Sequence, residues 1–410
     1  MMHGGMFFWM GLLFCFWVIS MLSEPRASSA PVPAARPLTA EEQPAVVKEV
    51  MDVRFAEQEY GVRIFHGQLR EPAAEVQAKL KRVLGSEVSP RLQADERFGA
   101  SIVLVPEPVE NVGVQKNARP WVNGLLFALT ILTTTWAGAA HQGVNLLHEP
   151  GRFAVGLPYA LGLLAILGVH ELGHYFMARY HGIRVTLPFF IPVPFALGTF
   201  GAFIEMRSRA ENRRALFDVA VAGPLAGLAV AIPALLIGLR SSAIIAAGAE
   251  PAAGMMHGGT AVGSSVLLTL LAKLSLGPAL LEGHVLQLSP LAFAGWLGLM
   301  VTALNLLPIG QLDGGHIARA MFGRRAGETI GSVAMWTLLL LGLFVWPGLL
   351  TWAIIVFFIA GRGESPMDDL SPLTASRRWL GYAAFAILAL ILTPLPHTLW
   401  GAAGLHCPYM

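Results

Sequence analysis

Long apolar segments with very few charges constrain this chain more than any other feature of its sequence. They follow one another from Trp121 onward, at about 121–139, 154–178, 215–239, 290–310, 329–346, 347–361 and 379–396. A helix of about 20 apolar residues can cross the hydrocarbon core of a bilayer, where every backbone polar group must be paired inside the segment. The sequence therefore predicts an all-α polytopic membrane protein with about 7–8 transmembrane helices.

Composition restricts the class of protein further. Of the 410 residues only 13% are charged, whereas soluble proteins carry about 25%. The formal net charge of +2 gives no indication of a nucleic-acid partner. Two cysteines, Cys15 and Cys407, cannot form a disulfide framework or a thiolate metal site. Any metal must therefore have His, Asp or Glu ligands, and the expected partners are the lipid bilayer and other membrane proteins.

The part of the chain before Trp121 has a different organisation. We interpret residues 1–22 as an apolar anchor or signal-like segment and residues 23–39, rich in Pro, Ala and Ser, as a linker. Residues 40–120 hold a large share of the charge and combine strand-like runs with a helical pattern over Pro72 to Leu84. They predict a small soluble α+β domain at the N-terminal side of the membrane spans.

Arginines in the loops predict the orientation of the spans. They gather at residues 179–214, 319–325 and 377–378, whereas residues 241–263 contain no Lys or Arg. Loops rich in Lys and Arg lie on the cytosolic or equivalent side of a membrane. With this assignment, successive loops alternate between the two sides of the membrane along the whole chain. The soluble domain then lies on the same side as the arginine-rich loops.

The span over 154–178 carries the run His170-Glu171-Leu172-Gly173-His174 near its end. On a helix His170 and His174 lie one turn apart on one face, so both imidazoles can reach one metal ion. Glu171, beside the first ligand, can accept a proton from a water at that metal. A central charge in a span costs about 2.5–3.5 kcal/mol, so a functional role is the default interpretation. The alternative is a polar cluster that packs against another helix.

A catalytic zinc site has three protein ligands and a water, so two histidines leave it one ligand short. The best third ligand is Asp313, because the span over 290–310 breaks at Pro308 and then presents this carboxylate. Broken backbone at membrane depth is tolerated where it lines an enclosed or watery cavity. An Asp-Gly turn that ends the helix explains the spacing equally well. His316 and Glu205 are rival third ligands.

The chain resembles the site-2 protease family of intramembrane metalloproteases in three motifs: His170-Glu171-Leu172-Gly173-His174, Asn305-Leu306-Leu307-Pro308 and Leu312-Asp313-Gly314-Gly315. The resemblance implies one zinc ion per chain, bound by His170, His174 and Asp313, with Glu171 activating the water. It also implies a three-helix protease core formed by the spans over 154–178, 215–239 and 290–310.

Further stretches resemble the EGY-type branch of this family, known from plastids, cyanobacteria and other bacteria. They are Ile64 to Arg70, Gly198 to Ala202, Asn212 to Asp218 and Pro290 to Ala292. The branch usually has Gly-Asn-Leu-Arg where this chain has Gly67-Gln68-Leu69-Arg70. The expected organisation is an extra span and loop at 121–149, the metalloprotease core at 150–325 and C-terminal spans at 326–410.

These features predict an intramembrane zinc endopeptidase that cuts substrates with a transmembrane segment within or beside the lipid. We expect it in a bacterial inner membrane, or in a plastid membrane if the source is eukaryotic. A pseudoprotease that binds clients without cutting them is one alternative. A metal or proton transporter is another, but transporters carry internal repeats, and neither motif has a second copy here.

Three further features bear on mechanism. Asn305 is a candidate oxyanion donor, although a hydrogen bond between helices explains it as well. Residues 196–206 could form a hairpin or edge strand on which an extended substrate pairs, or a simple membrane-dipping connector. Gly223 and Gly227 have the GxxxG spacing, which we interpret as close helix packing.

Overall fold

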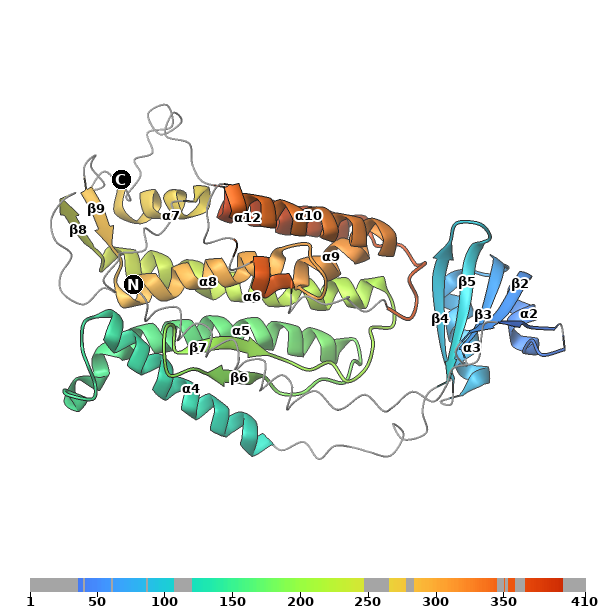
Figure 1. Cartoon of the computed structure of the whole chain (residues 1–410), viewed down its shortest axis with the longest axis horizontal. Coiled ribbons are helices and arrows are strands. Elements are labelled where there is room, and N and C mark those ends of the chain that lie inside the picture. Colours follow the sequence, from blue (N-terminus) through green and yellow to red (C-terminus); the bar gives the residue numbers. More distant parts are fainter. Residues whose placement is uncertain are drawn as a thin grey trace, which may run out of the picture.

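The computed structural model describes residues 36–39, 41–59, 62–85, 88–106, 120–246, 265–277, 284–344, 350, 353–357 and 366–393. An N-terminal α+β region lies at one end of a set of long, roughly parallel helices (Figure 1). The predicted apolar segment 1–22 and most of the linker 23–39 lie outside the described residues.

The N-terminal region is an antiparallel sheet of five strands with two helices. The strand order is β1-β2-β3-β5-β4, and the elements are β1 (Arg36–Pro37), α2 (Ala45–Val50), β2 (Met51–Glu59), β3 (Val62–Leu69), α3 (Ala73–Leu84), β4 (Val88–Asp95) and β5 (Gly99–Pro106). Val76 and Leu80, one turn apart on α3, are fully buried with Phe65 and Ile102 of the sheet. The predicted helix over 72–84 and the small α+β region are thus confirmed.

The rest of the described chain is mostly helical. Its elements are α4 (Pro120–His141), η2 (Pro150–Gly156), α5 (Leu157–Tyr180), β6 (Phe189–Pro192), β7 (Thr199–Phe203), α6 (Arg213–Arg240), β8 (Ala243–Ala246), α7 (Val266–Leu276), β9 (His284–Gln287), α8 (Pro290–Leu306), α9 (Asp313–Phe322), α10 (Arg324–Phe344) and α12 (Ala375–Leu392). The strands form two separate antiparallel pairs, β6 with β7 and β8 with β9. Of residues 196–206, for which a hairpin, an edge strand and a connector were all open, Thr199–Phe203 form β7, and its partner β6 lies before that stretch.

The predicted count of 7–8 spans is not confirmed. Among the described residues, 5 helices are long and apolar enough to cross a membrane: Pro120–His141, Pro150–Tyr180, Arg213–Arg240, Arg324–Phe344 and Ala375–Leu392. The span expected over 290–310 is the shorter α8, because the chain breaks after Leu306. The span expected over 347–361 lies largely outside the described residues.

Helices α5, α6 and α8 pack on one another and form the centre of the helical part. Small residues at the crossings allow this. A Cβ on Gly298 of α8 would lie 2.9 Å from the Ala231 Cβ of α6 and 2.9 Å from a methyl carbon of Ile166 on α5. Helices in lipid have no hydrophobic driving force to associate, so close packing of this kind stabilises their contact instead. The three helices are those that the resemblance assigns to the protease core.

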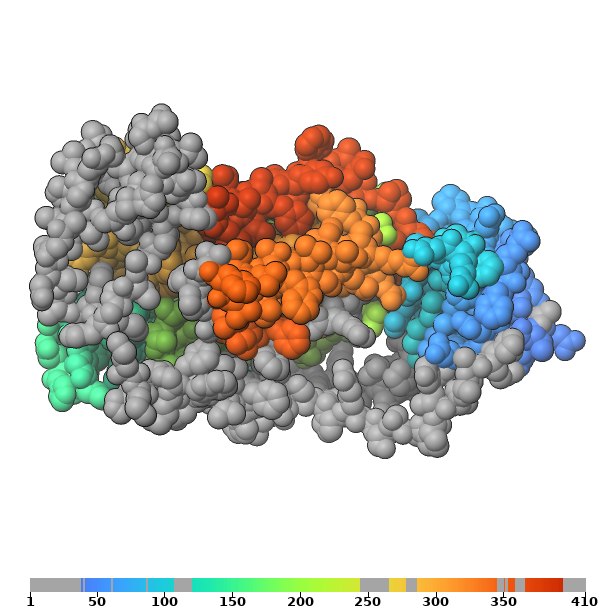
Figure 2. Space-filling view, turned by 45° about the horizontal axis from the view of Figure 1, so that its top comes forward, coloured from blue at the N-terminus to red at the C-terminus, as the bar shows by residue number. Residues whose placement is uncertain are grey.

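A segment that we call the strap, residues 366–371, joins the N-terminal region to the helices. The backbone N–H of Leu92 in edge strand β4 donates to the Met367 carbonyl at 2.8 Å, and the Asp369 N–H donates to the Leu92 carbonyl at 3.0 Å. Leu370 packs against the core of the N-terminal region. In the space-filling view the two parts of the molecule abut directly (Figure 2).

The other side of the strap is bonded to the chain that leads into α6. The Met367 N–H donates to the Ala210 carbonyl at 3.0 Å, and the Arg213 guanidinium binds the buried Asp369 carboxylate with an N–O distance of 2.8 Å. The strap therefore lies between the sheet of the N-terminal region and the first turn of α6.

Candidate metal centre

The second half of α5 carries the two histidines and the glutamate. His170, Glu171 and His174 are buried, with exposed fractions of 3%, 7% and 7%. Residues four positions apart on a helix are neighbours on one face, so the imidazoles of His170 and His174 lie side by side, with ring centroids 4.9 Å apart. The sequence-based expectation of a histidine pair on one helix face is confirmed.

Asp313 reaches this pair because the chain breaks sharply between α8 and α9. Helix α8 ends at Leu306, and α9 begins at Asp313. A Cβ on Gly314 would collide with the Leu306 carbonyl oxygen, and one on Gly315 would lie 2.5 Å from the Gly310 carbonyl oxygen. Only glycines fit behind the aspartate, which explains the Asp-Gly-Gly motif.

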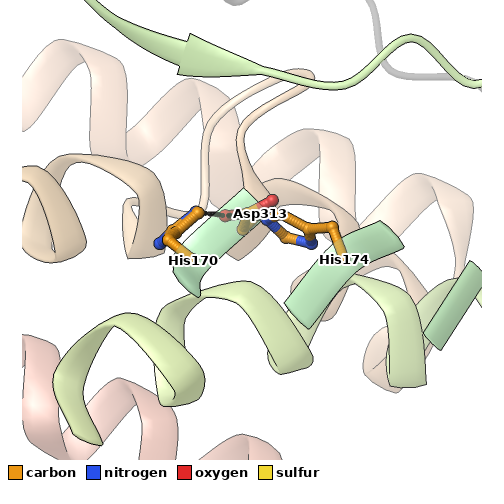
Figure 3. Close-up of side chains that lie close together, drawn as sticks. All are labelled: His170, His174 and Asp313. Atoms are coloured by element: carbon orange, nitrogen blue, oxygen red, sulfur yellow. Dashed lines mark hydrogen bonds and ion pairs between the residues drawn. The ribbon is translucent and has the colours of Figure 1, made fainter. Parts of the chain in front are cut away.

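The three side chains converge on one point, as Figure 3 shows. The Asp313 Oδ2 lies 3.4 Å from His170 Nε2 and 3.3 Å from His174 Nε2. The two histidine nitrogens are 3.1 Å apart. All three potential ligand atoms lie within 4.8 Å of one another, and no other group of three His, Cys, Asp or Glu does so among the described residues. The rivals His316 and Glu205 do not join the cluster.

The hydrogen bonding of His174 fits a metal ligand. Its Nδ1 lies 2.8 Å from the Val219 carbonyl oxygen of α6. A carbonyl oxygen only accepts, so Nδ1 carries the proton and the lone pair on Nε2 faces Asp313 and His170. Two imidazole nitrogens and one carboxylate oxygen, with an outer hydrogen bond that fixes the tautomer, suit a zinc ion.

Space for the imidazoles comes from two glycines on α6. A Cβ on Gly223 would overlap the His174 ring, and a Cβ on Gly227 would lie 3.1 Å from the Nδ1 of His170. The interpretation of the GxxxG spacing as close helix packing is confirmed. The packing partner is the ligand pair itself, which the spacing alone does not reveal.

Glu171 and Asn305 border the cluster. The backbone N–H of Ile204, directly after β7, lies beside the Glu171 carboxylate. The side-chain nitrogen of Asn305, near the end of α8, lies 3.3 Å from His170 Nε2. Both predicted residues are therefore close to the point where the three potential ligands meet.

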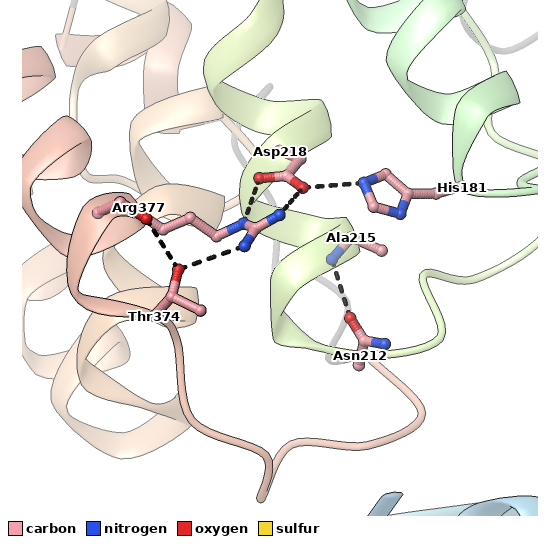
Figure 4. A network of polar contacts seen from close by, with 7 residues as sticks. His181, Asn212, Ala215, Asp218, Thr374 and Arg377 are labelled. Carbon is pink, nitrogen blue, oxygen red and sulfur yellow. Dashed lines mark hydrogen bonds and ion pairs between the residues drawn. The ribbon is translucent and has the colours of Figure 1, made fainter.

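A second polar network, missed at the sequence level, joins α6 to α12 and to the end of α5 (Figure 4). The Asp218 carboxylate of α6 accepts from Arg377 of α12 at 2.7 and 2.8 Å. It also lies 2.9 Å from His181 Nε2, at the C-terminal cap of α5. Asn212 caps α6, with its Oδ1 2.9 Å from the Ala215 nitrogen. The sequence feature that could have indicated this network is the stretch from Asn212 to Asp218, noted above only for its resemblance to the EGY-type branch.

Comparisons with known proteins agree with this geometry. Residues 158–345 match peptidase family M50. The chain belongs to the site-2 protease family. Within it the chain falls in the EGY-type branch. It is 31% identical over 376 residues to the probable zinc metalloprotease EGY1, chloroplastic, of Arabidopsis thaliana, covering 81% of this chain and 66% of the relative.

Two relatives from rice show the same similarity. A probable zinc metalloprotease EGY1, chloroplastic, of Oryza sativa subsp. japonica is 35% identical over 243 residues, 58% of this chain and 41% of the relative. A probable zinc metalloprotease EGY2, chloroplastic, of Oryza sativa subsp. indica is 38% identical over 216 residues, 52% of this chain and 38% of the relative. The chain thus spans 38% to 66% of the lengths of these three relatives. Because all three are named as chloroplast proteins, they give no support to the expected bacterial inner membrane.

The two glycines provide a matched test of the metal centre. Gly223→Ala should lower zinc affinity by about 100-fold, the upper range for lost support of a ligand, because the new methyl group displaces the His174 imidazole. Gly227→Ala should lower zinc affinity by less than about tenfold, because its Cβ would lie 3.1 Å from His170 Nδ1 and a small shift of the ring relieves this contact. Zinc titration of the two detergent-purified variants measures the difference. Equal affinities would contradict the assignment of Gly223 as the space for a ligand.

Proposed function

We propose that this protein is a zinc-dependent intramembrane endopeptidase that hydrolyses peptide bonds of membrane-protein substrates within or beside the bilayer. The observation that carries the proposal is the meeting of His170, His174 and Asp313 next to the buried Glu171. The site lies among helices that are long and apolar enough to cross a membrane. Relatives named as zinc metalloproteases support the same activity.

Each residue of the cluster has a distinct task in this reaction. His170, His174 and Asp313 would hold one zinc ion, with the imidazoles oriented by their contacts to α6. Zinc, when bound, supplies a Lewis acid for the scissile carbonyl and lowers the pKa of water toward neutrality. Glu171 would take the proton of the attacking water and return it to the leaving amine. The Ile204 N–H, at the end of the hairpin, lies beside this carboxylate.

Glu171→Gln separates catalysis from metal binding. We expect it to keep zinc and to lose cleavage by about 1,000-fold, within the range typical for a general base. His174→Ala and Asp313→Ala should lose the zinc as well. The measurement combines metal analysis of purified protein with cleavage of a panel of single-span membrane segments reconstituted with it.

Other outcomes of this experiment identify the alternatives. Wild-type protein that binds zinc and membrane segments but cuts none would be a pseudoprotease. Zinc flux into sealed vesicles that is abolished by Asp313→Ala would instead indicate a transporter. Cleavage that persists in Glu171→Gln at the wild-type rate would remove Glu171 from the mechanism.

Asn305 would donate a hydrogen bond to the oxyanion that develops on the scissile carbonyl. Its side-chain nitrogen already lies at the metal pocket, 3.3 Å from His170 Nε2. Loss of one oxyanion donor costs about 100- to 1,000-fold in kcat, so Asn305→Ala should slow cleavage by that factor at unchanged zinc content. A loss below about tenfold would leave Asn305 as a packing residue between α8 and α5.

The hairpin β6–β7 would present the substrate. A transmembrane helix hides its peptide bonds in its own hydrogen bonds, so it must become extended before attack, and an extended segment can add to a strand edge. β6 packs against α4, and β7 lies on the side of α5. Within the described part of the chain β7 pairs only with β6, so its other edge is open on the side of the helix that carries Glu171. The Ile204 N–H, directly after β7, lies beside that carboxylate.

Proline at Ala202 tests this pairing. Backbone N–H groups alternate between the two edges of a strand, so the Ala202 N–H should lie on the same edge as that of Ile204. Ala202→Pro removes this donor and should lower cleavage at least about tenfold, the effect of one lost main-chain hydrogen bond. Ala202→Gly keeps the N–H and is the matched control. Unchanged cleavage by the proline variant would rule out pairing at this edge.

A further inference from the structure

Helix α4 lies outside the three-helix core, yet its side chains hold the hairpin β6–β7 at both ends. Before β6, the Asn123 amide donates to the carbonyl oxygens of Leu187 at 3.1 Å and Pro188 at 2.9 Å. At the turn, the Thr133 hydroxyl lies 2.7 Å from the Gly198 carbonyl oxygen. These three hydrogen bonds to main-chain carbonyls, from two residues at opposite ends of the hairpin, fix both its position and its tilt.

A fourth hydrogen bond reaches the turn from α5. The Tyr159 hydroxyl donates to the Leu197 carbonyl at 2.9 Å. Tyr159 is 1% exposed, and its ring stacks on Phe293 of α8 with centroids 5.8 Å apart. A buried tyrosine hydroxyl requires a hydrogen-bond partner, and here the hairpin turn supplies it.

The turn backbone lies directly on the α4 surface. Gly198 has a φ of 81°, and a Cβ there would lie 2.5 Å from the Thr134 Cα and 2.6 Å from the Thr133 carbonyl oxygen. The Thr134 hydroxyl bonds the Thr130 carbonyl of its own helix at 2.6 Å. The Thr133 hydroxyl also has carbonyls of its own helix within reach, at 3.1 and 3.2 Å, but the hairpin carbonyl is nearer. The face of α4 that carries Thr133 and Thr134 thus packs directly against the hairpin turn and donates a hydrogen bond to it.

We propose that Asn123, Thr133 and Tyr159 are positioning residues, which fix the hairpin, and with it the substrate strand, relative to Glu171. This inference rests on the proposed function. The hairpin extends from α4, which packs against β6, to α5, which packs against β7 and carries Glu171. Successive residues of a strand are about 3.3 Å apart, so a hairpin that slides by this distance brings a neighbouring peptide bond to the glutamate. The anchors therefore determine which bond is cut.

The experiment compares variants of the full-length protein in lipid nanodiscs by two measurements. Asn123→Leu combined with Thr133→Val removes two anchors and keeps side-chain volume, whereas Thr133→Ser keeps the hydroxyl. Thr337→Val is the matched control, because it removes a hydroxyl on α10 that bonds only within its own helix among the contacts described. The first measurement is amide hydrogen exchange of residues 197–204, and the second is the distribution of cleavage sites by mass spectrometry.

We expect the double variant to raise exchange over 197–204 at least tenfold, with unchanged zinc content and unchanged exchange in α5 and α6. Cuts at bonds next to the main site should rise from below a hundredth to above a tenth of the products. Tyr159→Phe should act in the same direction. Thr133→Ser and Thr337→Val should behave as the wild type does.

Two results would overturn the inference. Unchanged exchange over 197–204 would show that the contacts do not anchor the hairpin. Raised exchange with a single, unchanged cleavage site and a merely lower rate would show a structural role without positioning. If wild-type protein cuts no membrane segment, the proposed function fails, and the exchange measurement still decides whether α4 anchors the hairpin.

Discussion

The metal centre depends on the contact between α5 and α6. Where α5 presents imidazoles, α6 presents glycines, and the helices approach closely enough for the Val219 carbonyl to reach His174 Nδ1 at 2.8 Å. One contact therefore makes room for the ligands and selects the tautomer of one of them. Helices in lipid gain no hydrophobic free energy when they associate, so close packing of this kind also holds the pair together.

Asp313 is positioned by backbone rather than by a helix face. The break after α8 pairs its polar groups locally, with the Ile309 N–H donating to Leu307 at 2.7 Å and the Leu312 N–H to Ile309 at 3.1 Å. Such pairing makes irregular backbone tolerable inside a protein at membrane depth. The cluster thus combines a pair of side chains on one rigid helix with a carboxylate from a compact turn that only glycine permits.

The positions of site residues were predictable from the sequence where they depend only on neighbouring residues in the chain. Helical spacing places His170 beside His174, and Pro308 marks the break of the apolar span after which Asp313 follows. The partners of Asp218 and Thr133 were not predictable in this way. Asp218 bonds Arg377, 159 positions further along the chain, and Thr133 bonds Gly198, 65 positions away. Such pairs depend on tertiary packing, which no periodicity encodes. Span length failed as a criterion for α8, since apolarity continues past Leu306 while the helix does not.

The first two turns of α6 connect the N-terminal region to the metal centre. Arg213 binds Asp369 of the strap, Asp218 binds Arg377 of α12, and the next residue, Val219, supplies the carbonyl for His174. Asn212, Arg213 and Asp218 of the EGY-type stretch thus each have a structural partner, and none of the three enters the metal cluster. The stretch therefore serves assembly rather than chemistry. It makes the strap, and the sheet bonded to the strap, part of the same packed unit as the helix that orients His174.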